Sequence, residues 1–206
     1  MVSPDPRADR KGHASARPAF TLVEALVAIT ITAMAGSVLL LGTTVSLQTT
    51  TDSLRETIAA GMAEQLMDEI VGCRYAAVGA GGRQLDLGPS AYESQGQGRS
   101  RYDDIDDYDT FQAGPPRDPW AIPLGTDDGE GDRRYPSAQV PEGFFDNWQQ
   151  TVNVYYVDPT DWTARLPDGR TSDYRAIEVR IFYNDPQRGS RELAHLRRIV
   201  AYVPEL

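Results

Sequence analysis

The sequence predicts an α+β protein in which a long N-terminal helix, membrane-spanning in its first half, packs on a C-terminal antiparallel β-sheet. An uncharged apolar run follows a short basic leader, an amphipathic helical pattern continues that run to about residue 74, and alternating strand patterns fill residues 147–206. Helical segments followed by a run of strands are typical of this class. A length of 206 residues suits one domain with attachments.

The charge of the chain limits its partners. The formal net charge is -10, although residues 1–19 carry four basic residues against two acidic ones. An acidic chain repels nucleic-acid phosphates, which argues against a nucleic-acid partner. Cys73 is the only cysteine, so the sequence excludes an intramolecular disulfide and a cysteine-rich metal site.

The apolar run predicts a membrane helix. Residues 25–51 are 27 consecutive residues without a charge, and a bilayer needs about 20 apolar helical residues. A secretory signal peptide is the rival interpretation, but its apolar core is only about 7–15 residues long. We therefore expect residues 20–47 to cross the membrane once, with residues 1–19 in the cytoplasm by the positive-inside rule.

Glu24 is an ionisable residue at the edge of this predicted membrane helix. A charge there is costly, and such residues usually have a partner. No basic residue lies in the helical turns that follow. Glu24 is therefore either a carboxylate held among the lipid headgroups or one that binds a cation from elsewhere.

Residues 17–29 read Arg-Pro-Ala-Phe-Thr-Leu-Val-Glu-Ala-Leu-Val-Ala-Ile. This segment resembles the prepilin signal of type IV pilins and type II secretion pseudopilins, and the resemblance implies a pilin-like fold. It implies that prepilin peptidase cuts between Ala19 and Phe20 and methylates the new amino terminus of Phe20. It also implies that Glu24 binds the amino terminus of a neighbouring subunit during filament assembly. The family usually has glycine before the cut, where this chain has Ala19.

The resemblance implies a function in assembly. We expect a minor pseudopilin, similar to the I-type pseudopilins and V-type minor pilins, in the periplasmic pseudopilus of a type II secretion system. Its expected partners are prepilin peptidase, other pseudopilins or pilins and the inner-membrane assembly platform, and its head would be periplasmic. A minor subunit of a type IV pilus, serving adhesion, motility or DNA uptake, is one alternative. A signal-anchored periplasmic enzyme is another.

The helix is expected to continue beyond the membrane over residues 48–74. Apolar residues recur there every four positions, at Leu54, Ile58, Met62, Leu66 and Ile70. This stripe is typical of an amphipathic helix. Several glycines from residue 72 onward predict its end, so one helix is expected from Phe20 to about Arg74.

Residues 75–146 are rich in Gly, Pro and Asp, which predicts an irregular segment with short strands near Tyr102 and Trp120. Calcium takes several carboxylate and carbonyl oxygens from a flexible loop. The candidate calcium ligands are Asp103, Asp104, Asp106 and Asp107. The alternatives are a solvated acidic loop, or a turn whose aspartates accept hydrogen bonds from backbone N–H groups.

Period-two patterns predict three strands over residues 151–157, 177–183 and 199–203, with their apolar face on the helical stripe. A turn over residues 184–190 joins the second and third strands.

The residues offer little for catalysis. His195 is the only histidine outside the leader and is expected at a sheet edge or surface, while Cys73 is expected to pack. No nucleophile elbow, zinc-binding helix or phosphate-binding loop is present. The three tryptophans at 120, 148 and 162 are expected as core and strand residues, and the alternative is a platform that binds a sugar or a partner. We expect no enzyme activity and no cofactor, apart from the candidate calcium.

Overall fold

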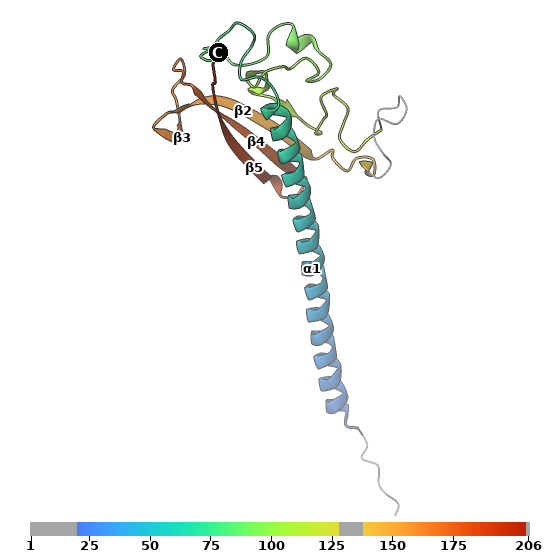
Figure 1. Ribbon diagram of the computed structural model, residues 1–206. Coiled ribbons are helices and arrows are strands. Elements are labelled where there is room, and N and C mark those ends of the chain that lie inside the picture. The colour runs from blue at the N-terminus through green and yellow to red at the C-terminus, as the bar shows by residue number, and fades with distance from the viewer. Residues whose placement is uncertain (1–19, 128–137, 205–206) are drawn as a thin grey trace, which may run out of the picture. The chain divides into compact units, whose positions relative to one another are not determined.

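The computed structural model describes residues 20–127 and 138–204. The leader, with Ala19 at the predicted cleavage site, lies outside the described residues. The chain divides into two compact units, Met1–Thr50 and Thr51–Leu206. Helix α1, Leu22–Val71, has residues in both (Figure 1), and each unit is described by itself.

In the first unit, the described part of α1 has no buried residue. Among the described residues, α1 is the one helix long and apolar enough to cross a membrane. Its hydroxyl side chains donate hydrogen bonds to carbonyls three or four residues earlier in the helix, so their polarity is satisfied within the helix. These residues are Thr30, Thr32, Ser37, Thr43, Thr44, Thr49 and Thr50.

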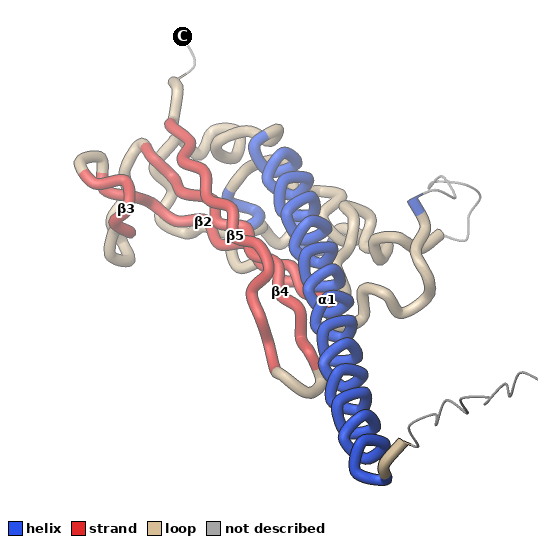
Figure 2. Tube along the Cα trace, turned by 90° about the horizontal axis from the view of Figure 1, so that it is seen from below, coloured by secondary structure: helices blue, strands red, loops and turns tan. Residues whose placement is uncertain are grey.

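In the second unit, the strands form an antiparallel sheet in the order β1-β2-β4-β5, with β3 paired to β2. Figure 2 shows the long strands β2, β4 and β5 beside the helix. The strands are β1 Gln112–Ala113, β2 Trp148–Asp158, β3 Asp161–Arg165, β4 Tyr174–Asp185 and β5 Gly189–Ala201. Two short 3-10 helices, Glu93–Gln95 and Asp106–Tyr108, lie in the segment before β1.

The core lies between the second half of α1 and one face of this sheet. Val152 pairs with Val179 and Val154 with Ile177, so alternate residues of β2 and β4 share the buried face. The helix contributes Ala59, Met62, Ala63, Leu66, Met67 and Ile70. The predicted packing of a long helix on an antiparallel sheet is therefore confirmed, although Leu54, at the start of the predicted stripe, is exposed.

Several predicted boundaries were wrong. The helix begins after Thr21, which caps it, and ends before Gly72, where the Cys73 N–H bonds the Ile70 carbonyl and tightens the last turn. The third strand starts at Gly189 instead of residue 199, because polar residues hide its alternation.

The segment before the sheet also differs from the prediction. Tyr102 lies in an irregular stretch and Trp120 in a turn; isolated bridges at Arg74–Asp104 and Arg117–Pro123 and the two-residue strand β1 lie nearby. Trp148 is buried as expected, but Trp120 and Trp162 are 51% and 53% exposed. Trp120 occupies a turn and is neither a core nor a strand residue, whereas Trp162 lies in the short strand β3, as a strand residue outside the core.

Candidate functional site

The first candidate site is the N-terminus of α1. Thr21 precedes the helix, and its Oγ1 accepts a hydrogen bond from the Glu24 N–H at 3.2 Å. In return, Glu24 Oε2 accepts bonds from the Thr21 N–H at 3.0 Å and from the Thr21 hydroxyl at 3.1 Å. This reciprocal arrangement is a capping box, which satisfies N–H groups that have no partner within the helix.

The capping box fixes the Glu24 carboxylate at the positive end of the helix dipole, where a negative charge is favoured. Phe20, directly before the cap, is 77% exposed. Thr21 was not among the predicted site residues, although the Thr-x-x-Glu spacing is a known capping signal. The predicted site residues Phe20 and Glu24 thus lie within one helical turn, on either side of Thr21.

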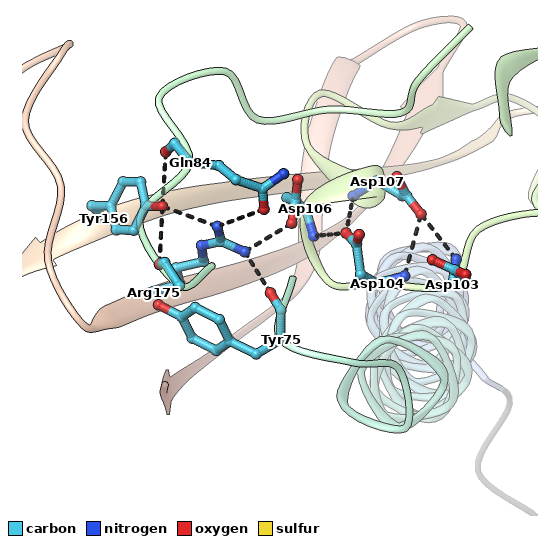
Figure 3. Close-up of polar contacts among 9 residues, drawn as sticks. Tyr75, Gln84, Asp103, Asp104, Asp106, Asp107, Tyr156 and Arg175 are labelled. Carbon is cyan, nitrogen blue, oxygen red and sulfur yellow. Dashed lines mark hydrogen bonds and ion pairs between the residues drawn. The ribbon is translucent and has the colours of Figure 1, made fainter. Parts of the chain in front are cut away.

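The second candidate site is the acidic turn, which we define as residues 103–107. Asp104 Oδ1 accepts hydrogen bonds from the N–H groups of Asp106 and Asp107, at 3.1 and 3.3 Å. Asp107 Oδ2 accepts bonds from the N–H groups of Asp103 and Asp104, at 2.9 and 3.2 Å (Figure 3). Asp104, Asp106 and Asp107 are buried. The geometry matches the backbone-capping alternative and differs from a solvated loop.

Another aspartate of the turn, Asp106, binds Arg175 of β4. Arg175 Nη1 donates to Asp106 Oδ1 at 2.8 Å and to the Tyr75 carbonyl. Its Nη2 donates to the Tyr156 hydroxyl at 2.9 Å and to Gln84 Oε1 at 3.3 Å (Figure 3). The guanidinium also lies over the rings of Tyr75 and Tyr156. Arg175 therefore ties three separate segments to β4.

The candidate calcium ligands are not brought together as one set. Asp104 is occupied by backbone N–H groups, and Asp106 is occupied by Arg175. Among the described residues, the carboxylate oxygens of Glu93, Asp103 and Asp107 lie within 4.8 Å of one another. Calcium takes six to eight oxygen ligands, so this group would supply only part of a shell.

Burial also changes the acidity of the turn. Burial and the neighbouring Asp106 raise the pKa of Asp104 to about 7. Burial raises the pKa of Asp107 to about 6. Both groups therefore bind protons more tightly than ordinary aspartates. The consequence is a dependence of the free energy of unfolding on pH.

Cys73 and His195 lie where the sequence predicted them, in the packing of the core and at the edge of the sheet. Cys73 is half-buried against the core, and burial raises the pKa of its thiol. His195 is exposed on β5, the terminal strand of the sheet, with Nε2 3.7 Å from Glu178 Oε1.

Comparisons with protein-family models, with curated proteins and with solved structures found no match to this chain. The site is therefore interpreted from its own residues.

Proposed function

We propose that this chain is a minor pseudopilin of a type II secretion system. The observation that carries the proposal is the segment Phe20–Glu24, which stands directly at the start of a helix long and apolar enough to cross a membrane. The α+β arrangement of the second unit agrees with a helix that ends in a folded head. In this proposal the chain is anchored in the inner membrane with its head in the periplasm.

Assembly would use the capped carboxylate. Cleavage before Phe20 creates an ammonium group, and an ammonium and a carboxylate offset each other's desolvation when they meet in an apolar environment. Thr21 holds the Glu24 carboxylate in one orientation, so that the amino terminus of a neighbouring subunit can bind it. Prepilin peptidase, other pseudopilins and the assembly platform would be the partners.

The decisive experiment is the intact mass of the membrane-bound protein, measured in cells with and without prepilin peptidase. We expect a chain beginning at methylated Phe20 only when the peptidase is present. A mature protein that retains Met1 in both strains would contradict the proposal.

A second experiment separates the secretion system from a pilus. Deleting the gene in the native host should stop export of folded proteins and leave motility and surface pili unchanged. The opposite result would assign the chain to a type IV pilus.

A further inference from the structure

Strand β5 forms one edge of the sheet. It pairs with β4 on one side, and no strand among the described residues pairs with its other side (Figure 1). With 13 residues it is also the longest strand of the described chain. The main-chain N–H and C=O groups on the free side of an edge strand have no partner in the sheet, so they can pair with another strand.

The register of β5 identifies which main-chain groups are free. Antiparallel partners alternate between pairs that exchange main-chain hydrogen bonds and pairs that do not. The Tyr202 N–H donates to the Asp173 carbonyl at 2.7 Å. The next pair along the strands is Tyr174 with Ala201, so the main chain of Ala201 points away from β4, as does that of every second residue before it. These outward residues are His195, Arg197, Ile199 and Ala201. In the described part of the chain, their main-chain groups have no hydrogen-bond partner.

The core is incompletely closed along β5. Val179 of β4 is fully buried, but its partner Leu196 on β5 is only partly buried. Val200, which also packs against the core, is partly buried as well. Covering apolar surface that remains in water is favourable. The edge therefore has both unpaired main-chain groups and apolar side chains that a further strand would cover.

The charges of β5 are compensated within the chain. Charged residues on an edge strand usually discourage the addition of another strand. Here the Arg197 guanidinium lies 3.6 Å from the Glu178 carboxylate, and that of Arg198 lies 3.3 Å from Asp68 of α1. An added strand therefore needs no acidic residues to neutralise this edge.

We propose that the edge of β5 binds an extended strand of a different protein, which continues the sheet through hydrogen bonds to residues 195, 197, 199 and 201. In strand addition, main-chain hydrogen bonds supply affinity and alternate side chains supply specificity. The added strand would carry apolar residues at every second position, beside Leu196 and Val200 on the side of the helix. The inference stands independently of the proposed pseudopilin function.

An antiparallel pair of two copies fits less well. Residues 52–68 of α1 run in the same direction as β5, because Arg191 contacts Asp52 and Arg198 contacts Asp68. Antiparallel pairing of β5 with the β5 of a second copy would reverse this direction in the second copy. Two copies that enter one membrane through their N-terminal helices point in the same direction, which favours a different protein as the partner.

The test uses the full-length chain in membranes of its native host, with the photoreactive residue benzoylphenylalanine in place of the exposed His195. The matched control carries the same residue in place of Trp120, which is 51% exposed in a turn outside the sheet. We expect position 195 to form an adduct with a different protein and the control position to form none with that protein.

Proline substitution then tests whether the main chain carries the contact. Ile199→Pro removes a free N–H group but leaves the hydrogen bonds to β4 in place, and it should lower the adduct yield about tenfold. Ile199→Val keeps the N–H group and should leave the yield unchanged. Protease resistance of the head establishes that each variant is folded. If Ile199→Pro is unfolded, Ala201→Pro removes the free N–H group at the end of β5 and should give the same loss.

Amide hydrogen exchange, located by residue, provides a second readout. In the chain purified in detergent, the amides of residues 195, 197, 199 and 201 should exchange faster than those of residues 196, 198 and 200, which bond β4. In the purified adduct, the four outward amides should become protected.

Four results would overturn the proposal: no adduct at position 195, an adduct only with lipid or a second copy of this chain, equal yields for folded proline and valine variants, or outward amides that stay unprotected in the adduct. Any of these together with a mature N-terminus at Phe20 would reject this inference and keep the proposed function. An adduct that depends on the free N–H group together with an unprocessed N-terminus would do the reverse.

Discussion

Arg175 Nη1 lies 2.8 Å from Asp106 Oδ1, and both side chains are almost fully buried. A buried ion pair is tolerated only when further hydrogen bonds satisfy its remaining polar atoms. Three more acceptors around Arg175 meet this need, although its Nε has no hydrogen-bond partner within the described residues. The pair therefore fixes where the irregular segment before the sheet docks on β4.

Arg175→Ala should lower the free energy of unfolding by about 3–5 kcal/mol, because it leaves the Asp106 carboxylate buried without its cation. Urea unfolding of the full-length chain in detergent, followed by tryptophan fluorescence, measures the loss. The matched control is the double variant Arg175→Met with Asp106→Leu, which removes both charges and should recover most of the stability. Equal stability of Arg175→Ala and the parent chain would refute this role.

The acidic turn should make the fold less stable as pH rises. The pKa of Asp107 is raised to about 6 and that of Asp104 to about 7. Between about pH 4 and about pH 7 the folded chain holds protons that the unfolded chain has released, so stability falls with increasing pH across that window. The hydrogen bond from Arg83 lowers the pKa of Asp173. Carboxylates of this kind change the stability only below about pH 4, outside this window. Urea midpoints measured from about pH 4 to about pH 8 test the slope.

Asp104→Asn isolates the cause of this slope. The amide oxygen can still accept the two backbone N–H bonds that Asp104 Oδ1 accepts, but the side chain can no longer ionise. The slope should shrink, and stability near pH 8 should increase. Asp103→Asn changes a more exposed neighbour and should leave the slope in place. An unaltered slope in Asp104→Asn would assign it to other groups.

Local patterns in the sequence predicted the parts of the fold that depend on neighbouring residues. The four-residue repeat of Met62, Leu66 and Ile70 predicted the buried side of α1, and all three are buried. The alternation around Ile177 and Val179 predicted β4 and its buried face. Each pattern reports burial directly, because one side of the element meets the core.

The contacts of the charged residues could not be predicted in this way. Charged residues usually lie on the solvated surface. Three of them are nevertheless buried here: Arg99, Arg175 and Asp106. Arg99 binds Glu69 of α1 through two hydrogen bonds of 2.8 and 2.9 Å, across 30 residues of sequence. Nothing local to either residue indicates such a partner, so the acidic turn was open to three interpretations.

The helical stripe can be tested by cavity formation. Met67 is fully buried between α1 and the sheet, whereas Leu54 is 56% exposed on the same helix. Met67→Ala should destabilise the second unit by about 2–5 kcal/mol, because it removes transfer energy and leaves a cavity. Leu54→Ala should change stability by less than about 0.5 kcal/mol. Urea unfolding that shows equal effects would place the core elsewhere.

The capping box allows the two roles of Glu24 to be separated. Glu24→Gln keeps an oxygen that can accept the bonds from Thr21 but removes the charge. If Glu24 binds the amino terminus of a neighbour, both Glu24→Gln and Glu24→Ala should insert normally and fail to co-assemble. Cross-linking of adjacent subunits in membranes, with total membrane-bound protein as the reference, measures both steps. Normal assembly of Glu24→Gln would leave the carboxylate with only its capping role.

Thr21 provides the complementary test. Thr21→Val retains the shape of the side chain but loses the hydroxyl, which should cost about 0.5–2 kcal/mol of local helix stability. Amide hydrogen exchange over the first turn should accelerate, and assembly should weaken because the Glu24 carboxylate is no longer held in one orientation. Thr21→Ser keeps the hydroxyl and should behave as the parent chain. If Thr21→Val exchanges faster but assembles normally, the neighbour's ammonium alone positions Glu24, and the cap contributes only to helix stability.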